Sequence, residues 1–193
     1  MNVLLIAEDF VKDEHVLLPI VTAMMNDLGK DRARIKVCKD PRFHGTGEAL
    51  RWEFIEQAID RHRGMIDLFL LCVDRDGNEH RRAALDGLEK QANAKLGIDR
   101  SFLAENAWQE IEVWLLAGHD LPADWKWSDI RDEPHPKERY YIPFAKSRGV
   151  LNLPGEGRGK LATEAAKRYR TIKSKCPEDV ANLETRISNF LKS

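Results

Sequence analysis

The sequence predicts an α/β protein: a mostly parallel sheet flanked by helices, with a helical tail at the C-terminal end. Two observations lead to this fold class. Residues 3–7 and 66–73 are near-continuous apolar runs, which is typical of strands buried on both faces of a parallel sheet. Segments with helical spacing follow each expected strand, and parallel sheets need this alternation because each connection must cross a face of the sheet.

Strands and helices alternate along the first part of the chain. Apolar side chains recur at helical spacing from Val16 to Leu28, and Gly29 is placed to end that helix. Gly64 and Gly97 are placed to end two later helices in the same way. The expected strands are residues 2–7, 34–38, 66–73 and 102–107, and the expected helices are residues 13–28, 48–63, 79–96 and 108–117.

The later part of the chain has a different character. Residues 119–159 are rich in proline and are expected to be mostly irregular, with one short strand near residues 140–144. The last two expected helices are residues 160–174 and 178–191. We therefore expect an α/β core that carries the functional site over residues 1–118, with residues 119–193 packed on it.

Composition limits the possible classes of protein. The 193 residues include 42% hydrophobic ones, which is enough for one core of ordinary size. The net charge of −1 gives no overall attraction to polyanions, so a nucleic-acid site would have to be local. The sequence has neither a transmembrane stretch nor a signal-peptide pattern, and its three cysteines fit no disulfide framework or zinc site. These features predict a cytoplasmic protein.

Acidic residues follow two of the expected buried strands. Glu8 comes directly after the first strand, Asp74 comes directly after the third, and Asp76 stands two residues further on. Open parallel sheets bind their ligands at the carboxyl ends of the strands. Carboxylates are hard oxygen ligands that suit Mg²⁺ or Mn²⁺. The sequence therefore predicts a divalent metal site at this edge of the sheet.

Each acid also has a purely structural interpretation. The sequence Asp-x-Asp-Gly-Asn at residues 74–78 is a favourable turn, and the acids that follow Glu8 suit the N-terminus of the next helix. Glu110 and Glu112 fit the outer face of an amphipathic helix. An EF-hand loop is excluded because Leu85 stands at its twelfth position. The combination of acids, more than any one of them, predicts a site.

The combination resembles the TOPRIM pattern: a glutamate after the first strand (Glu8) and an Asp-x-Asp after a later one (Asp74, Asp76). TOPRIM domains occur in topoisomerases, primases and nucleases of the overcoming-lysogenisation-defect (OLD) family. The segment Glu110-Ile-Glu112-Val-Trp-Leu-Leu-Ala also resembles a segment of small stand-alone OLD-like TOPRIM proteins from prokaryotic defence loci. Two positions depart from the pattern. Asp9 replaces the usual glycine after Glu8, and Lys12 stands where a second acid is usual, with Asp13 or Glu14 slightly further along.

The resemblance implies a TOPRIM-like (Rossmann-like) fold, a Mg²⁺ or Mn²⁺ cofactor and particular ligands. The expected ligands are Glu8, Asp74 and Asp76 for one ion, and Glu112 with Glu110 or Glu14 for a second. A lysine is also expected at the phosphate, with Lys146 as the first candidate and Lys137 as the second. The expected catalytic set is Glu8, Asp74, Asp76, Glu112 and Lys146.

Positive charge gathers over residues 158–175, where Glu164 is the only acid. A basic helix beside a metal site would follow the phosphates of a nucleic acid, and we expect DNA rather than RNA. The expected contacts are Arg158, Lys160, Lys167, Arg168 and Arg170. The glycine-rich residues 155–160 lack the spacing of a phosphate-binding loop, so ATP hydrolysis would have to come from another chain.

Together with these observations, the resemblance implies a Mg²⁺- or Mn²⁺-dependent nuclease, the effector of a two-component defence system with an ABC-type ATPase. One alternative is a catalytically silent TOPRIM-fold module that docks on an ATPase through Trp108, Trp114, Trp125 and Trp127. Another is a small-molecule phosphoryl hydrolase, which is less favoured because its Asp-x-Asp would follow the first strand rather than the third.

Overall fold

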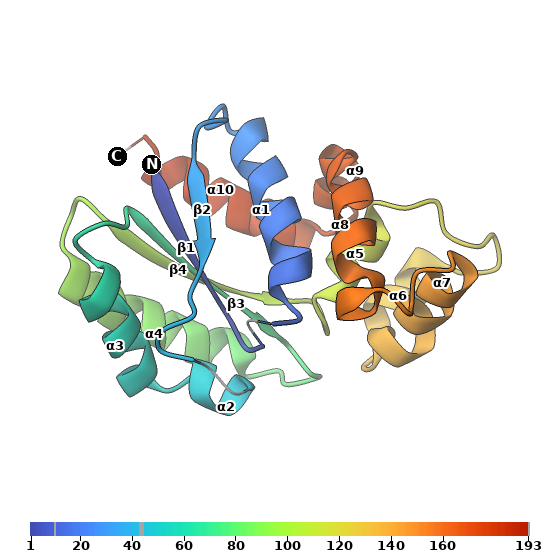
Figure 1. Cartoon of the computed structure of the whole chain (residues 1–193). Coiled ribbons are helices and arrows are strands. Elements are labelled where there is room, and N and C mark those ends of the chain that lie inside the picture. The colour runs from blue at the N-terminus through green and yellow to red at the C-terminus, as the bar shows by residue number, and fades with distance from the viewer. Residues whose placement is uncertain (10, 43–44, 193) are drawn as a thin grey trace.

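The computed structural model describes residues 1–9, 11–42 and 45–192. Over these residues, four strands form an all-parallel sheet in the order β2-β1-β3-β4, which confirms the predicted α/β class (Figure 1). The strands are β1 (Asn2–Ala7), β2 (Arg34–Val37), β3 (Leu68–Asp74) and β4 (Ser101–Ala107). The fold is Rossmann-like, since helices connect the parallel strands and flank the sheet.

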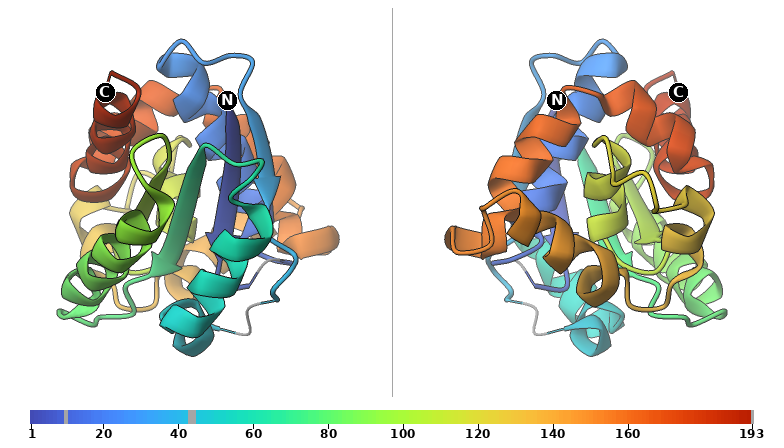
Figure 2. Two further views of the ribbon diagram at one scale, coloured as in Figure 1. Left: turned by 90° about the vertical axis from the view of Figure 1, so that its left-hand side faces the viewer. Right: turned by 90° about the vertical axis from the view of Figure 1, so that its right-hand side faces the viewer.

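Helices cover both faces of the sheet (Figure 2). Successive strand residues point to opposite sides, and the strands carry apolar side chains on both sides, so each face is buried under helices. Leu5 and Leu70 pack with α1 (Glu14–Asp27) and with the C-terminal helices α8 (Arg158–Ala166), α9 (Tyr169–Lys175) and α10 (Asn182–Phe190). Ile6 and Leu71 pack on the other face with α3 (Trp52–His62) and α4 (Arg81–Leu96).

The strand order places a switch point between β1 and β3. The chain goes from β1 to β2 on one side, and then crosses over to β3 on the other side of β1. Neighbouring connections therefore leave the sheet in opposite directions at the carboxyl ends of β1 and β3, where such sheets have their ligand crevice. Glu8 follows β1 directly, and Asp74 is the last residue of β3.

Residues 112–147 contain three short helices beyond the carboxyl ends of β3 and β4 (Figure 1). They are α5 (Glu112–Ala117), α6 (Trp127–Asp132) and α7 (Ile142–Ser147). The strand expected near residues 140–144 was wrong: a π-helical turn, Lys137–Tyr141, leads directly into α7. Tyr140, Tyr141, Phe144 and Ala145 are buried, and this spacing follows one face of a helix rather than the alternation of a strand.

Two helices that were expected to be continuous are each broken into two. The helix expected at residues 48–63 consists of α2 (Thr46–Ala49) and α3, separated by the extended backbone of Arg51. The helix expected at residues 160–174 consists of α8 and α9, which meet at Arg168. The second break turns Tyr169 and Ile172 into the core. A 3-10 turn (Pro154–Gly157) precedes α8, and a π-helical turn (Pro177–Ala181) precedes α10.

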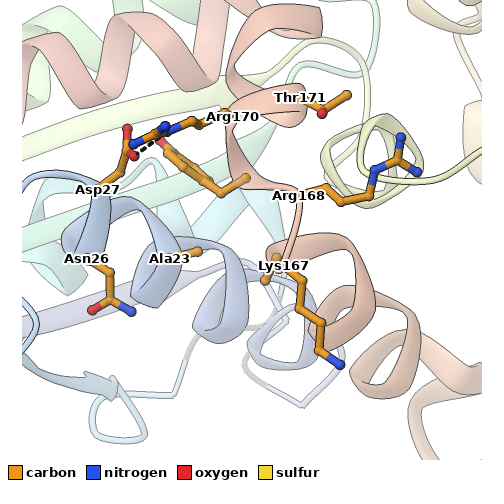
Figure 3. Close-up of a pocket in the computed structure, with 9 residues that line it drawn as sticks. Ala23, Asn26, Asp27, Lys167, Arg168, Arg170 and Thr171 are labelled. Atoms are coloured by element: carbon orange, nitrogen blue, oxygen red, sulfur yellow. Dashed lines mark hydrogen bonds and ion pairs between the residues drawn. The ribbon is translucent and has the colours of Figure 1, made fainter.

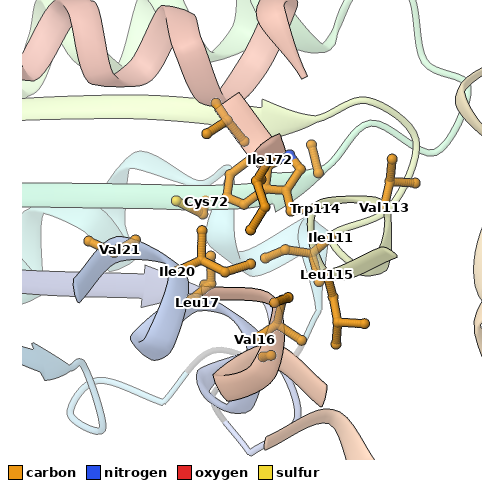
Figure 4. Close-up of a cluster of buried hydrophobic side chains, with 14 of the residues drawn as sticks. Val16, Leu17, Ile20, Val21, Cys72, Ile111, Val113, Trp114, Leu115 and Ile172 are labelled. Carbon is orange, nitrogen blue, oxygen red and sulfur yellow. The ribbon is translucent and has the colours of Figure 1, made fainter. Parts of the chain in front are cut away.

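Trp114 anchors the segment beyond the sheet to the core. Its side chain is fully buried together with Ile20 of α1, Cys72 of β3 and Ile172 of α9 (Figure 4). Asp179 accepts hydrogen bonds from the Trp114 indole N–H (2.7 Å) and from the Trp108 backbone N–H (2.8 Å).

Asp179 also forms an ion pair of 3.1 Å with Arg131 of α6, so one buried carboxylate joins α5, α6 and the turn before α10. The cysteines Cys38, Cys72 and Cys176 are buried and free. None of the helices in the described part of the chain has the length and apolar character needed to cross a membrane.

Candidate functional site

A cleft of about 180 Å³ lies at the switch point, at the carboxyl ends of β1 and β3. We call it the acidic cleft because six carboxylates line it: Glu8, Asp9, Asp13, Asp74, Glu110 and Glu112. The cations on its wall are Lys12, Lys137 and Arg158. The cleft thus combines the sheet edge with two residues from beyond position 118, Lys137 and Arg158.

Glu8 is fixed at the junction of the two strands. One of its oxygens accepts the backbone N–H of Asp74 at 2.7 Å, and the other accepts the hydroxyl of Thr46 at the start of α2. Burial raises the pKa of Glu8 above its usual range, although both hydrogen bonds act in the opposite direction. The carboxyl group therefore holds the end of β3 against the end of β1.

Asp74 lies among several of the other acids of the cleft. Its Oδ1 accepts the backbone N–H of Ile111 at 2.8 Å, while Oδ2 has no hydrogen-bond donor among the described residues. Burial raises the pKa of Asp74 well above its usual range, and the neighbouring carboxylates of Glu112, Glu8 and Asp13 raise it further. A divalent cation would relieve this repulsion.

Asp13, and not Glu14, is the second acid of the turn after β1. Asp13 lines the cleft, and its Oδ2 accepts the backbone N–H of Asp9 at 3.0 Å. Burial raises the pKa of Asp13 to about 7, with smaller contributions from Glu112 and Glu8. Glu14, which the resemblance offered as a metal ligand, instead forms an ion pair of 3.2 Å with Lys39.

The geometry of the turn decides which of the two adjacent acids lines the cleft. Asp9 replaces the usual glycine, and its Oδ1 accepts the N–H groups of Val11 (2.9 Å) and Lys12 (3.2 Å). This side-chain turn lengthens the connection, and Asp13 then stands immediately before the first residue of α1. The next residue is rotated by about 100° around the helix, which takes Glu14 out of the cleft.

Glu112 and Arg158 form a buried ion pair. The Arg158 Nε and Nη2 lie 2.9 and 2.6 Å from the same oxygen of Glu112, and the Arg158 side chain is 1% exposed. Its Nη1 contacts the carbonyl oxygen of Gly155 at 3.2 Å and the carboxylate of Glu156. Arg158 therefore does not lie on an exposed helix face as a contact for nucleic acid, which is a correction to the sequence analysis.

The glycine-rich stretch before α8 is the turn that delivers Arg158. Gly155, Glu156 and Gly157 all have positive φ, at 64°, 57° and 81°. A Cβ atom at Gly155 would overlap the ring of His15, so the close approach to α1 also requires glycine. The glycine-rich residues 155–157 therefore form a turn of left-handed backbone rather than a phosphate-binding loop.

A second group of possible metal ligands lies at the rim of the cleft. Glu110, His135 and Glu138 could hold a metal ion, since one ligand atom from each lies within 4.8 Å of the others. Burial raises the pKa of Glu110 to about 7, although its carboxylate accepts the backbone N–H of Lys137 at 2.7 Å. We call this group the rim triad. The sequence analysis proposed Glu110 but missed His135 and Glu138, which are far from it in sequence.

Two other expected site residues lie outside the cleft wall. Asp76 has a positive φ of 51°, a side chain that is 49% exposed and an ion pair of 3.5 Å with Arg81. Its charge still raises the pKa of Glu8, so it lies close to the site without lining it. Lys146 is exposed on α7, whereas Lys137, the second candidate, lines the cleft.

Three basic residues expected to bind nucleic acid gather at the other end of α1. Lys167, Arg168 and Arg170 line a groove of about 450 Å³ together with Asn26 and Asp27 (Figure 3). Since α1 begins at the acidic cleft and has 14 residues, this groove is roughly 20 Å from the carboxylates.

Both arginines of this groove already form ion pairs. Arg170 forms an ion pair of 3.0 Å with Asp27, and Arg168 one of 2.8 Å with Asp120. Lys160 is exposed in the first turn of α8 and does not line the cleft. The residues of the expected basic helix are thus separated: Arg158 lines the acidic cleft, whereas Lys167, Arg168 and Arg170 line the groove at the other end of α1.

Comparison of the chain with models of known protein families gave no match. Comparisons with curated proteins and with solved structures gave no match either. The functional interpretation therefore depends on the residues of the cleft.

The donor set of the cleft suits a hard divalent cation. Within the part of the chain that the structure describes, no donor contacts Oδ1 of Asp13, Oδ2 of Asp74 or Oε2 of Glu112. These are carboxylate oxygens, the ligands that Mg²⁺ and Mn²⁺ prefer. Both oxygens of Glu8 already accept hydrogen bonds, so Glu8 would be a weaker ligand for such an ion than the carboxylates that have a free oxygen.

Proposed function

We propose that this protein is a Mg²⁺- or Mn²⁺-dependent nuclease with a TOPRIM-like site. The observation that carries the proposal is the meeting of Glu8, Asp13, Asp74 and Glu112 in one cleft at the switch point of the sheet. Carboxylates whose pKa values are raised by burial and mutual repulsion are characteristic of sites that gain from a bound cation. A bound ion would stabilise charge on phosphoryl oxygens and help to activate water.

The residues of the chain then have separable roles. Asp74 and Asp13 offer free oxygens to the ion, and Glu8 holds the backbone of Asp74 in place. Glu110, with a pKa of about 7, can take a proton from an attacking water near neutral pH. Lys137 supplies positive charge from the cleft wall to a phosphate group.

The expectation of an ABC-type ATPase partner, and of a role in defence, belongs to the same proposal. The glycine-rich turn at residues 155–157 holds Arg158 inside the fold, so it supplies no cradle for nucleotide phosphates.

The Trp114 side chain, one of those proposed for a silent docking module, is fully buried. Trp127 donates its indole N–H to the carbonyl of Lys175 at 2.9 Å, and Trp125 packs edge-on against Tyr140. This packing favours the enzyme over the docking module.

The test is a cleavage assay on plasmid and single-stranded DNA and on RNA, with Mg²⁺ or Mn²⁺ and with an EDTA control. Asp74→Asn is the informative variant, because the amide keeps an acceptor for the Ile111 N–H but removes the charge. We expect metal-dependent cleavage of DNA by the wild type and none by Asp74→Asn. Hydrolysis of p-nitrophenyl phosphate without cleavage of any nucleic acid would replace the nuclease with a small-molecule phosphatase. Equal behaviour of the two proteins would overturn both.

A further inference from the structure

The Glu112–Arg158 ion pair determines how many metal ions the acidic cleft can hold. We propose that the Arg158 guanidinium takes the place of a second metal ion, so that the cleft binds one divalent ion per chain. The inference rests on the proposed function, and it changes the expectation that Glu112 serves a second ion. Arg158 is then a positioning residue that neutralises Glu112.

The contact between the two side chains is short and excluded from solvent. Both Nε and Nη2 of Arg158 reach the same Glu112 oxygen, at 2.9 and 2.6 Å, and the two side chains are 1% and 5% exposed. Removing one partner of a buried pair leaves an uncompensated charge, which is unfavourable, so the pair resists separation. A second metal ion at the other oxygen of Glu112 would lie beside this guanidinium, on a carboxylate whose charge is already neutralised.

The fold holds Arg158 in this position from several sides. The Tyr141 ring centroid lies 5.0 Å from the guanidinium carbon, and the Tyr141 hydroxyl donates to the carbonyl oxygen of Glu156 at 2.7 Å. Glu156, which also contacts Arg158, adopts positive φ although it is not glycine, and such a backbone persists only where its surroundings impose it. These contacts hold the Arg158 guanidinium in place, so we expect it to remain on Glu112 when a metal ion binds in the cleft.

The distribution of charge leaves ligands for one ion. With Glu112 paired, Asp13 and Asp74 each keep a free oxygen and have no ion pair with a basic side chain among the described residues, while Glu110 belongs to the rim triad. The guanidinium would also repel a cation placed against Glu112. It supplies a permanent positive charge on Glu112, the carboxylate that a second ion would otherwise neutralise.

The number of bound ions tests the proposal. Isothermal titration calorimetry with Mn²⁺ would be done in a His135→Asn background, which removes an ion held by the rim triad. We expect one ion per chain, and one ion again after Glu112→Gln, with affinity changed by less than about tenfold. Arg158→Met should expose Glu112 and allow two ions, and Arg158→Met with Glu112→Gln should return the count to one.

Arg158→Lys is the conservative control, because it keeps a positive charge at the same place and should keep the count at one. If the Met variants do not fold, the counts for the background protein and for Glu112→Gln decide the question alone. Two ions in the background protein, falling to one with Glu112→Gln, would overturn this inference and leave the proposed nuclease intact. Absence of any Mn²⁺ binding would overturn the proposed function together with it.

Discussion

Replacing Asp13 by asparagine should stabilise the metal-free protein, with an effect that depends on pH. Asp13 has a partly buried carboxylate close to Glu8 and Glu112, and desolvation raises its pKa from 3.8 to about 7. Asparagine has the same shape and keeps an acceptor for the Asp9 N–H that now donates to Oδ2 at 3.0 Å. The change therefore removes the charge and little else.

The expected magnitude follows from the pKa of Asp13. Because the folded-state pKa lies above the usual 3.8, the folded chain binds more protons than the unfolded chain between these values, and stability falls as the pH rises from 3.8 to about 7. At pH 8, ionised Asp13 destabilises the fold by up to about 4 kcal/mol relative to a neutral side chain of the same shape. At pH 5.5 this difference shrinks to about 2 kcal/mol.

The assay is urea unfolding in EDTA at pH 8 and pH 5.5, followed by tryptophan fluorescence. Glu14→Gln is the matched control: the neighbouring residue pairs with Lys39 outside the cleft and should change stability by less than about 1 kcal/mol at either pH. In saturating Mg²⁺ the order should reverse, because the wild type gains more binding energy than Asp13→Asn. Equal unfolding free energies for Asp13→Asn and wild type at pH 8 in EDTA would refute the reasoning that Asp13 is destabilised by its surroundings.

Three further changes have expected outcomes. Lys137→Met should lower the rate of DNA cleavage at saturating substrate, whereas Lys146→Met should leave it unchanged; equal effects would remove Lys137 from the cleft chemistry. Asp179→Ala should lower the unfolding free energy by about 3–5 kcal/mol, because Arg131 keeps only the exposed Glu178 as a partner and the N–H groups of Trp108 and Trp114 lose their acceptor; a urea midpoint within error of wild type would contradict this. Arg168→Gln should weaken the binding of long DNA and make that binding less dependent on salt, but should not alter the affinity for Mn²⁺. A changed Mn²⁺ affinity would contradict the separation of the basic groove from the acidic cleft.

The strands and the meeting of Glu8 with Asp74 could be predicted because they depend on local signals. Unbroken apolar runs mark strands buried on both faces, and carboxyl ends of neighbouring parallel strands share one edge. The structure places the backbone N–H of Asp74 2.7 Å from the carboxylate of Glu8, as this argument requires.

The other site residues depend on geometry that sequence spacing does not contain. Asp13 and Glu14 are adjacent, and only the exact start of α1 decides which one faces the cleft. Arg158 stands in a basic run, and only the left-handed turn before it shows that it points inward. Lys137 enters the cleft from a π-helical turn, where the sequence analysis expected irregular chain.

The position of a bound ion is the most direct test of the central claim, that the acidic cleft is a divalent metal site. A crystal soaked in MnCl₂ and measured at the manganese absorption edge would locate the ion by its anomalous signal. The account predicts a peak in the cleft within coordination distance of Asp74 and Asp13, with Arg158 still on Glu112. A peak only at Glu110, His135 and Glu138, or no peak at all, would contradict it.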